Sequence, residues 1–190
     1  MTNDNGLPWH IVEAAIYKEK QWLLQMMDFG QSRNDVLQKD PTHSTSISAD
    51  EMLRHLSISI VRGYIRARQY TSKEMNGLWT DNKIRLALEN SSERHGGEWH
   101  RAMLALIKRH FLDQGYTVSN EPSLMYGRAD LGAYKKDHQN IYIEVGSTSL
   151  YKTWINMHAT PDCIFLFVPT VYCALEFSTL DKMPSPFPKE

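Results

Sequence analysis

The sequence predicts an α/β protein, in the broad sense that includes α+β folds, with a helical N-terminal part and a mixed sheet flanked by helices. Before residue 91, apolar residues with helical spacing alternate with polar loops. After residue 97, one helical stretch is followed by short runs rich in Ile, Val, Tyr and Phe, which are typical of strands. These patterns divide the chain into a helical region, residues 1–95, and a sheet-containing domain, residues 96–190.

The composition is that of an ordinary globular protein. A hydrophobic fraction of 42%, a charged fraction of 23% and a net charge of -1 argue against a strongly basic coat protein and against an acidic disordered tail. No stretch approaches the roughly 20 apolar residues of a membrane span, and the N-terminus lacks a signal-peptide pattern. We therefore expect a cytoplasmic protein without membrane contact. Free thiols are expected at Cys163 and Cys173, with a disulfide as the alternative.

Several helices are expected in the N-terminal region. Apolar residues recur near helical spacing in residues 9–29. Two capping boxes, SADE at 48–51 and TSKE at 71–74, mark further helix starts. Thr80 can cap one more helix in residues 81–90.

The segment between the two capping boxes has features of a helix-turn-helix. The capped helix is followed by a candidate turn at 57–59 and then by a stretch with Arg62, Arg66 and Arg68. Arginines at this density can contact nucleic-acid phosphates. The alternative is a helical bundle that packs on the C-terminal domain with its arginines in water.

The C-terminal domain is expected to contain, in order, one helix, three strands, a second helix and one or two strands. The first helix covers residues 98–114, and the second covers residues 149–159, capped by Ser147 or Ser149. The expected strands are residues 116–121, 129–134, 141–145, 163–169 and 171–177.

Two acidic residues on neighbouring strands form a candidate metal site. Alternation in IYIEV at 141–145 separates Glu144 from the face that carries the isoleucines. If Tyr134 pairs with Asn140 in a hairpin, Asp130 stands directly opposite Glu144, whereas a slip of one residue separates the two carboxylates. Side-by-side carboxylates repel each other, and a bound cation relieves that repulsion. Oxygen ligands of this kind suit Mg²⁺ together with phosphate oxygens.

The motif GRAD at 127–130, followed by IYIEVG at 141–146, resembles the core of the PD-(D/E)xK nuclease superfamily, which includes restriction endonucleases and Holliday-junction resolvases. The resemblance covers residues 97–168. It implies a restriction-endonuclease-like core, a nuclease activity and Mg²⁺ or Mn²⁺ as the cofactor. The metal ligands that it implies are Asp130, Glu144 and Val145.

The resemblance also implies two further catalytic residues. Glu98, in the first turn of the helix after Gly97, matches the helix glutamate of the superfamily. Gly146 stands where the superfamily has its catalytic lysine, but members are known to move this lysine to the following helix. Lys152, three residues after Ser149, fits that displaced position.

Each of these residues also has an ordinary interpretation. Glu144 could be a surface acid on an edge strand, and Asp130 a turn residue. Glu98 could simply favour a helix N-terminus, and Lys152 could be a solvated helix lysine. The functional interpretation depends on all four falling in the right order on the right elements.

The sequence therefore predicts a metal-dependent endonuclease that hydrolyses phosphodiester bonds, with DNA expected before RNA as its partner. Arg128, beside Asp130, is expected to contact nucleic acid together with the three arginines of the 62–68 segment. One alternative is a catalytically inactive nuclease fold that binds nucleic acid or a partner protein. Another is a DNA-binding regulator that reads DNA through residues 48–70. A homodimer or a larger complex is left open.

Overall fold

The computed structural model describes residues 8–27, 38–39, 46–75, 82, 97–170 and 172–180. The principal helices in these residues are α1 (Trp9–Met26), α2 (Ala49–Val61), α3 (Ser72–Met75), α5 (Glu98–Asp113) and α6 (Leu150–Ala159). The strands are β1 (Gln38–Lys39), β2 (Ser46–Ile47), β3 (Ile65–Tyr70), β4 (Thr117–Asn120), β5 (Leu131–Tyr134), β6 (Asn140–Val145), β7 (Cys163–Thr170) and β8 (Cys173–Thr179).

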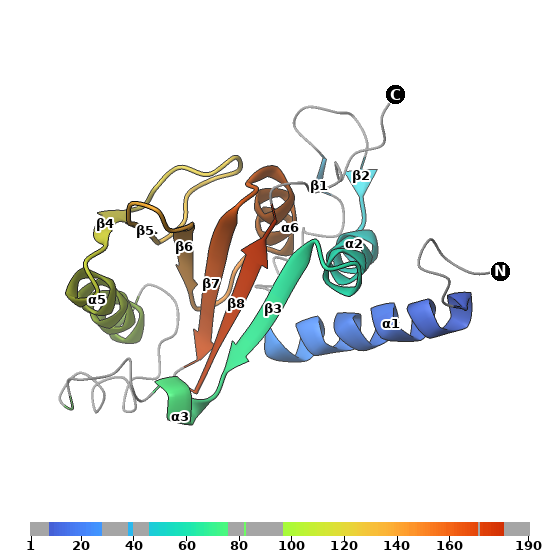
Figure 1. Cartoon of the computed structure of the whole chain (residues 1–190), viewed down its shortest axis with the longest axis horizontal. Coiled ribbons are helices and arrows are strands. Elements are labelled where there is room, and N and C mark those ends of the chain that lie inside the picture. Colours follow the sequence, from blue (N-terminus) through green and yellow to red (C-terminus); the bar gives the residue numbers. More distant parts are fainter. Residues whose placement is uncertain are drawn as a thin grey trace.

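Six of these strands form one mixed sheet in the order β3-β8-β7-β6-β5-β4, shown in Figure 1. Neighbouring strands are antiparallel except β6 and β7, which are parallel. A parallel pair needs a crossover connection, and α6 supplies it between β6 and β7. The short strands β1 and β2 form a separate antiparallel pair.

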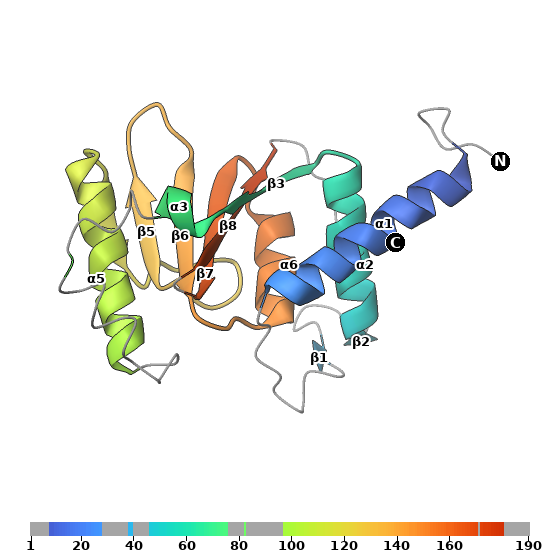
Figure 2. The same cartoon turned by 90° about the horizontal axis from the view of Figure 1, so that it is seen from below.

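Helices cover both faces of the sheet (Figure 2). On one face, Met103 and Phe111 of α5 pack with Ile143 and Val145 of β6. On the other face, apolar residues of α1, α2 and α6 pack with aromatic residues of β7 and β8, and Tyr142 of β6 joins this second cluster. The odd-numbered and even-numbered residues of β6 thus serve opposite faces, as the period of two in the sequence predicts.

The prediction for the C-terminal domain is largely confirmed. All five expected strands form in the expected order, with α5 before them and α6 between the third and the fourth. The hydroxyl of Ser149 accepts a hydrogen bond from the backbone N–H of Lys152, so Ser149 rather than Ser147 is the N-cap of α6. The mixed α/β fold class is therefore correct.

The helix-turn-helix interpretation is wrong, and so is the expectation, shared by the helical bundle, of a helix after Gly63. Helix α2 continues through residues 57–59 without a turn, and the Ser57 hydroxyl donates to the Leu53 carbonyl one turn earlier. The chain then turns at Gly63, which has a φ of 74°, a value that favours glycine. The following segment is β3, because Ile65 is buried in the core while its partner strand β8 satisfies the backbone. Two of the expected DNA-binding arginines, Arg66 and Arg68, therefore lie on a strand.

The expected boundary at residue 95 does not divide the sheet or the core. Strand β3 pairs along its whole length with β8, from Ile65↔Thr179 to Tyr70↔Ala174. The core cluster under α6 also contains buried residues from α1, α2 and β3. Helices α1 and α2 and strand β3 are thus structural parts of the same layered fold.

Other expectations have mixed outcomes. Both hydrogen bonds of the capping box at residues 48–51 are present: each of the two end residues accepts from the backbone N–H of the other. Thr71 and Glu74 form the same two hydrogen bonds at the start of the short helix α3. The helix expected in residues 81–90 lies outside the described residues apart from position 82. Both cysteines are free thiols. None of the helices in the described ranges combines the length and the apolarity that crossing a membrane requires.

Candidate active site

The two expected carboxylates meet where β6 ends and β5 begins. The pairs Leu131↔Ile143 and Ala133↔Ile141 fix the register of the hairpin. One residue beyond Ala133, the same register sets Tyr134 opposite Asn140. One residue before Leu131, it sets Asp130 opposite Glu144. The register on which the metal-site hypothesis depends is therefore confirmed.

Glu144 is a buried carboxylate with a lysine partner. Only 8% of the residue is exposed, and its Oε1 lies 2.7 Å from Nζ of Lys152. Burial raises the pKa of Glu144 to about 7, because it disfavours the charged form more strongly than Lys152 favours it. The nearby charge of Asp130 raises this pKa a little further.

Asp130 is held by the strand beside it and by α5. Its Oδ2 accepts a hydrogen bond of 2.8 Å from the backbone N–H of Val145. The same oxygen lies 3.5 Å from Nε2 of His100, a half-buried residue in the first turn of α5. The sequence analysis did not assign His100 a role. It lies two residues after Glu98, which is exposed at the start of α5 and whose expected role stays a prediction.

Lys152 reaches back from α6 to the end of the Glu144 strand, as its position after Ser149 predicted. Its aliphatic chain runs past Gly127: a Cβ added to this glycine would lie 3.9 Å from Cε of Lys152. Gly127 has a φ of 74°, so the backbone also favours glycine there. The GRAD segment thus borders the lysine as well as carrying Asp130.

The loop between β4 and β5, residues 121–130, reaches toward α6 in both Figure 1 and Figure 2. Asn156 of α6 fixes it at Tyr126, accepting a hydrogen bond of 2.8 Å from the Tyr126 N–H and donating one of 2.9 Å to the Tyr126 carbonyl. The Tyr126 ring meets the Tyr151 ring edge to face at 4.9 Å. We refer to this segment below as the β4–β5 loop.

The expected DNA-binding arginines fall into two groups. Strand β3, which carries Arg66 and Arg68, is separated from β6 by β8 and β7. Arg68 pairs with Glu74 and stacks on the ring of Tyr70, 4.4 Å from the ring centroid. Arg62 is exposed just after α2.

Of the four expected arginines, Arg128 lies next to the site, because it is two residues before Asp130 in the chain. Its guanidinium lies 3.3 Å from Glu121, and both side chains are largely exposed. An exposed ion pair of this kind contributes little to stability and can be exchanged for another anion.

The donor set at the site suits a hard cation. Carboxylate oxygens come from Asp130 and Glu144, and the main chain of Val145 lies beside them, because its N–H donates to Asp130. The Val145 carbonyl is therefore the main-chain oxygen that could join the two carboxylates. Divalent magnesium is bound by one or two carboxylates together with water and phosphate oxygens, so a large protein cage is not required. Among the described residues, no group of three or more His, Cys, Asp and Glu side chains is arranged to hold a metal ion.

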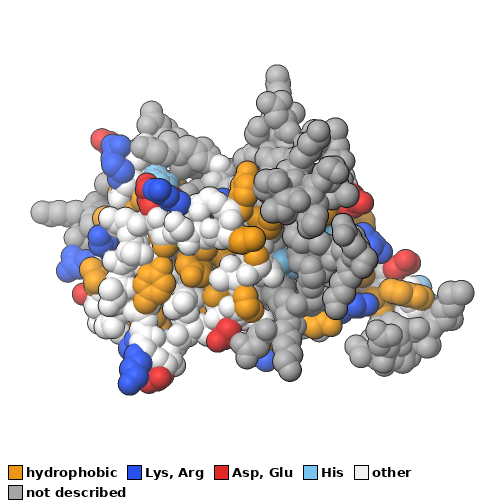
Figure 3. All heavy atoms as spheres, turned by 90° about the horizontal axis from the view of Figure 1, so that it is seen from above, with side chains coloured by type: hydrophobic (Ala, Val, Ile, Leu, Met, Phe, Trp, Pro, Cys, Tyr) orange, Lys and Arg blue, Asp and Glu red, His pale blue; other side chains and the backbone are white. Residues whose placement is uncertain are grey.

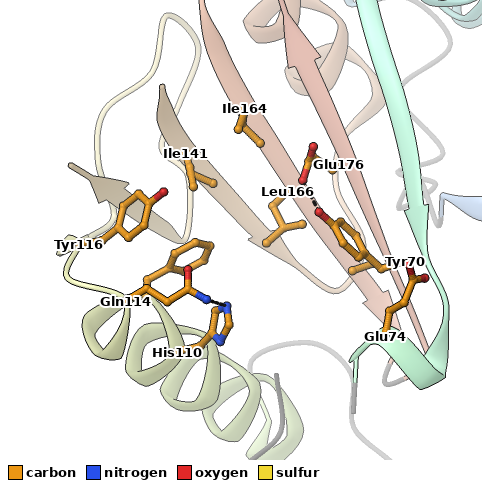
Figure 4. A pocket seen from close by; sticks show the side chains of 11 residues that line it. Tyr70, Glu74, His110, Gln114, Tyr116, Ile141, Ile164, Leu166 and Glu176 are labelled. Atoms are coloured by element: carbon orange, nitrogen blue, oxygen red, sulfur yellow. Dashed lines mark hydrogen bonds between the residues drawn. The ribbon is translucent and has the colours of Figure 1, made fainter. Parts of the chain in front are cut away.

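A second cleft, of about 480 Å³, lies on the α5 face near the start of β6 (Figure 4). Much of its lining is apolar, and two pairs of its polar groups bond to each other. The Tyr70 hydroxyl donates to Glu176 at 2.6 Å, and Gln114 bonds to His110 at 2.8 Å. Burial and this carboxylate raise the pKa of Tyr70 to about 12. No local pattern in the sequence predicts this cleft, because its lining comes from distant segments.

Comparison of the chain with protein-family models, with curated proteins and with solved structures gave no match. The class to which the described residues belong is therefore defined by geometry. It is a mixed α/β fold with a six-stranded mixed sheet, in which a buried glutamate, an aspartate and a helix lysine meet at one end of the central strands.

Proposed function

We propose that the chain is a Mg²⁺- or Mn²⁺-dependent nuclease that hydrolyses phosphodiester bonds in DNA, with a core similar to that of the PD-(D/E)xK superfamily. The observation that carries this proposal is the 2.7 Å contact between Lys152 and Glu144 beside Asp130. A lysine displaced to the helix compensates for Gly146 at the strand position.

Asp130 and Glu144, with the Val145 carbonyl, would hold the divalent cation. When bound, such an ion neutralises charge on a phosphate and lowers the pKa of bound water. The Val145 N–H and His100 both approach Oδ2 of Asp130 and so orient its carboxylate. Lys152 favours the ionised form of Glu144, and its ammonium can stabilise negative charge that develops on the reacting phosphate.

Cleavage of DNA by the full chain with Mg²⁺, with Mn²⁺ and with neither tests the proposal. Asp130→Asn and Glu144→Gln should each abolish cleavage. Asparagine is preferred to alanine because its carbonyl can still accept from the Val145 N–H. Glu176→Gln is the matched control: it changes a glutamate of the same sheet outside the proposed site, and it should cleave like the wild type. Equal activity of all three variants would refute the proposed site.

A catalytically inactive module that binds nucleic acid is the second candidate. The feature that favours it is Gly146, which leaves β6 without the lysine of the superfamily pattern. This candidate predicts metal-independent binding and no cleavage under any of the three conditions. The regulator interpretation lost its structural basis when the expected recognition helix proved to be β3.

A further inference from the structure

The β4–β5 loop is a rigid hairpin-like projection. Ser123 and Arg128 bridge its two sides, and the Leu124 N–H donates to the Gly127 carbonyl across the tip at 3.0 Å. At its base, the Ala129 N–H donates to Pro122. Together with the two hydrogen bonds that Tyr126 and Asn156 exchange, these contacts fix the tip before any ligand binds, which lowers the entropic cost of binding.

The tip carries exposed apolar side chains next to the candidate active site. Met125 is 70% exposed and Tyr126 is 37% exposed. Gly127 follows them and borders the chain of Lys152, and Asp130 ends the same loop. A ligand group that covers the tip therefore lies beside the residues that would act on a phosphate.

We propose that the β4–β5 loop is a stacking platform for unpaired bases, which directs the site to single-stranded nucleic acid. This inference rests on the proposed function. Thioether and aromatic side chains pack well on the flat face of a base, and every base offers such a face once it is unstacked. Bases inside a duplex have both faces covered, so the tip gains much less from duplex DNA.

Charge supports this choice of ligand. The exposed guanidinium of Arg128 can leave Glu121 for a phosphate of the bound strand. On the face shown in Figure 3, basic and acidic side chains of the described residues are interspersed, with hydrophobic side chains exposed among them. The chain has a net charge of -1. Binding that draws on base stacking as well as on phosphate contacts suits such a surface.

The test compares binding of a labelled single strand and of the same sequence as a duplex, by fluorescence anisotropy in buffer without divalent cations. The wild type should prefer the single strand. Met125→Ala should weaken single-strand binding by about two- to tenfold, the range expected for loss of one contact between a thioether and an aromatic ring, and should leave duplex binding nearly unchanged. Leu112→Ala, at an exposed leucine of α5, is the matched control and should change neither.

A single strand that carries 2-aminopurine gives a second measurement, because its fluorescence reports stacking on a side chain. The wild type and Leu112→Ala should change this fluorescence on binding, and Met125→Ala should reduce the change. Equal binding of single strand and duplex by the wild type, or no effect of Met125→Ala on single-strand binding, would overturn the stacking platform while the nuclease proposal stands. A wild type that neither binds nor cleaves nucleic acid would instead refute the proposed function, and this inference with it.

Discussion

Lys152 on α6 places its ammonium 2.7 Å from the carboxylate of Glu144 on β6, so the crossover helix supplies a cation to the end of the strand that it follows. The contact is local in sequence and is fixed by the Ser149 cap, which starts α6 three residues before the lysine. The cation is therefore positioned by the strand-to-helix connection itself.

The first prediction concerns this lysine. Lys152→Ala should lower the cleavage rate by about 100-fold or more, the scale of losing one electrostatic stabiliser, while nucleic-acid affinity falls much less. Single-turnover cleavage and anisotropy on the same variant measure both. Lys108→Ala, which removes a lysine bonded to Asn120 outside the site, should behave like the wild type. If Lys152→Ala keeps the wild-type rate, Arg128 becomes the cation to test.

The second prediction concerns the pH dependence of stability. The pKa of Glu144 is about 7 in the folded protein and near 4.5 in the unfolded chain, so the folded state binds more protons between these values. The free energy of unfolding should therefore fall, through this group, as pH rises from about 4.5 to 7, by a total on the order of 3 kcal/mol.

Urea denaturation of the wild type and of Glu144→Gln across this range isolates the contribution. The glutamine stays neutral, so the stability of the variant relative to the wild type should increase with pH. Glu176→Gln, in the same sheet, should show no comparable change. A constant difference between Glu144→Gln and the wild type would mean that Glu144 titrates normally.

The third prediction compares two glycines with the same backbone conformation. Gly63 and Gly127 both have a φ of 74°, so alanine at either should destabilise the fold by roughly 1–2 kcal/mol. A Cβ at Gly63 meets no atom within 4 Å, whereas one at Gly127 lies 3.9 Å from Lys152. Thermal unfolding should show similar losses for both variants. Only Gly127→Ala should also alter the cleavage rate, because the strained backbone at position 127 lies in the loop that carries Asp130 and borders Lys152. Equal activity of the two variants would show that Lys152 is insensitive to the loop.

The fourth prediction concerns His158, which joins α6 to α2. Its Nδ1 lies 2.7 Å from the Trp154 carbonyl, which can only accept, so in the neutral ring Nε2 accepts from the Ser59 hydroxyl at 3.1 Å. Burial lowers the pKa of His158 below its usual value of 6.5. The folded state then binds fewer protons than the unfolded chain, so the stability contributed by the neutral ring is lost as pH falls below about 6.5.

Unfolding of the wild type and of His158→Gln by urea at pH 7.5 and pH 5.5 checks this direction. The stability advantage of the wild type should be larger at pH 7.5. Ser59→Ala should lose about 1 kcal/mol at the higher pH, the usual contribution of one hydrogen bond. An advantage that grows at the lower pH would contradict a depressed pKa.

Local patterns in the sequence were sufficient for much of the fold and the site. Short runs rich in Ile, Val, Tyr and Phe predicted the C-terminal strands. The sequence named the register that sets Asp130 opposite Glu144 as one of two possibilities, and the structure has that register. A serine cap predicted where α6 begins and hence how Lys152 reaches the strand. Each of these features depends on residues close together in the chain.

Features that depend on distant contacts were missed. The IRARQY segment was expected to be helical, but it forms a strand because its partner β8, which lies far along the chain, pairs with it along its whole length. His100 meets Asp130 only because α5 packs across the sheet. The lining of the second cleft likewise comes from segments that only the tertiary fold brings together.

The pairing of β3 with β8 sets an order on folding. Ile65 pairs with Thr179, so β3 can join the sheet only after residue 179 has been synthesised and has left the ribosome. Until then, the apolar side chains of α2 and the unpaired edge of β3 are open to wrong partners, as in other folds with distant pairings. A fragment that stops before β8 keeps this exposed edge permanently and invites aggregation.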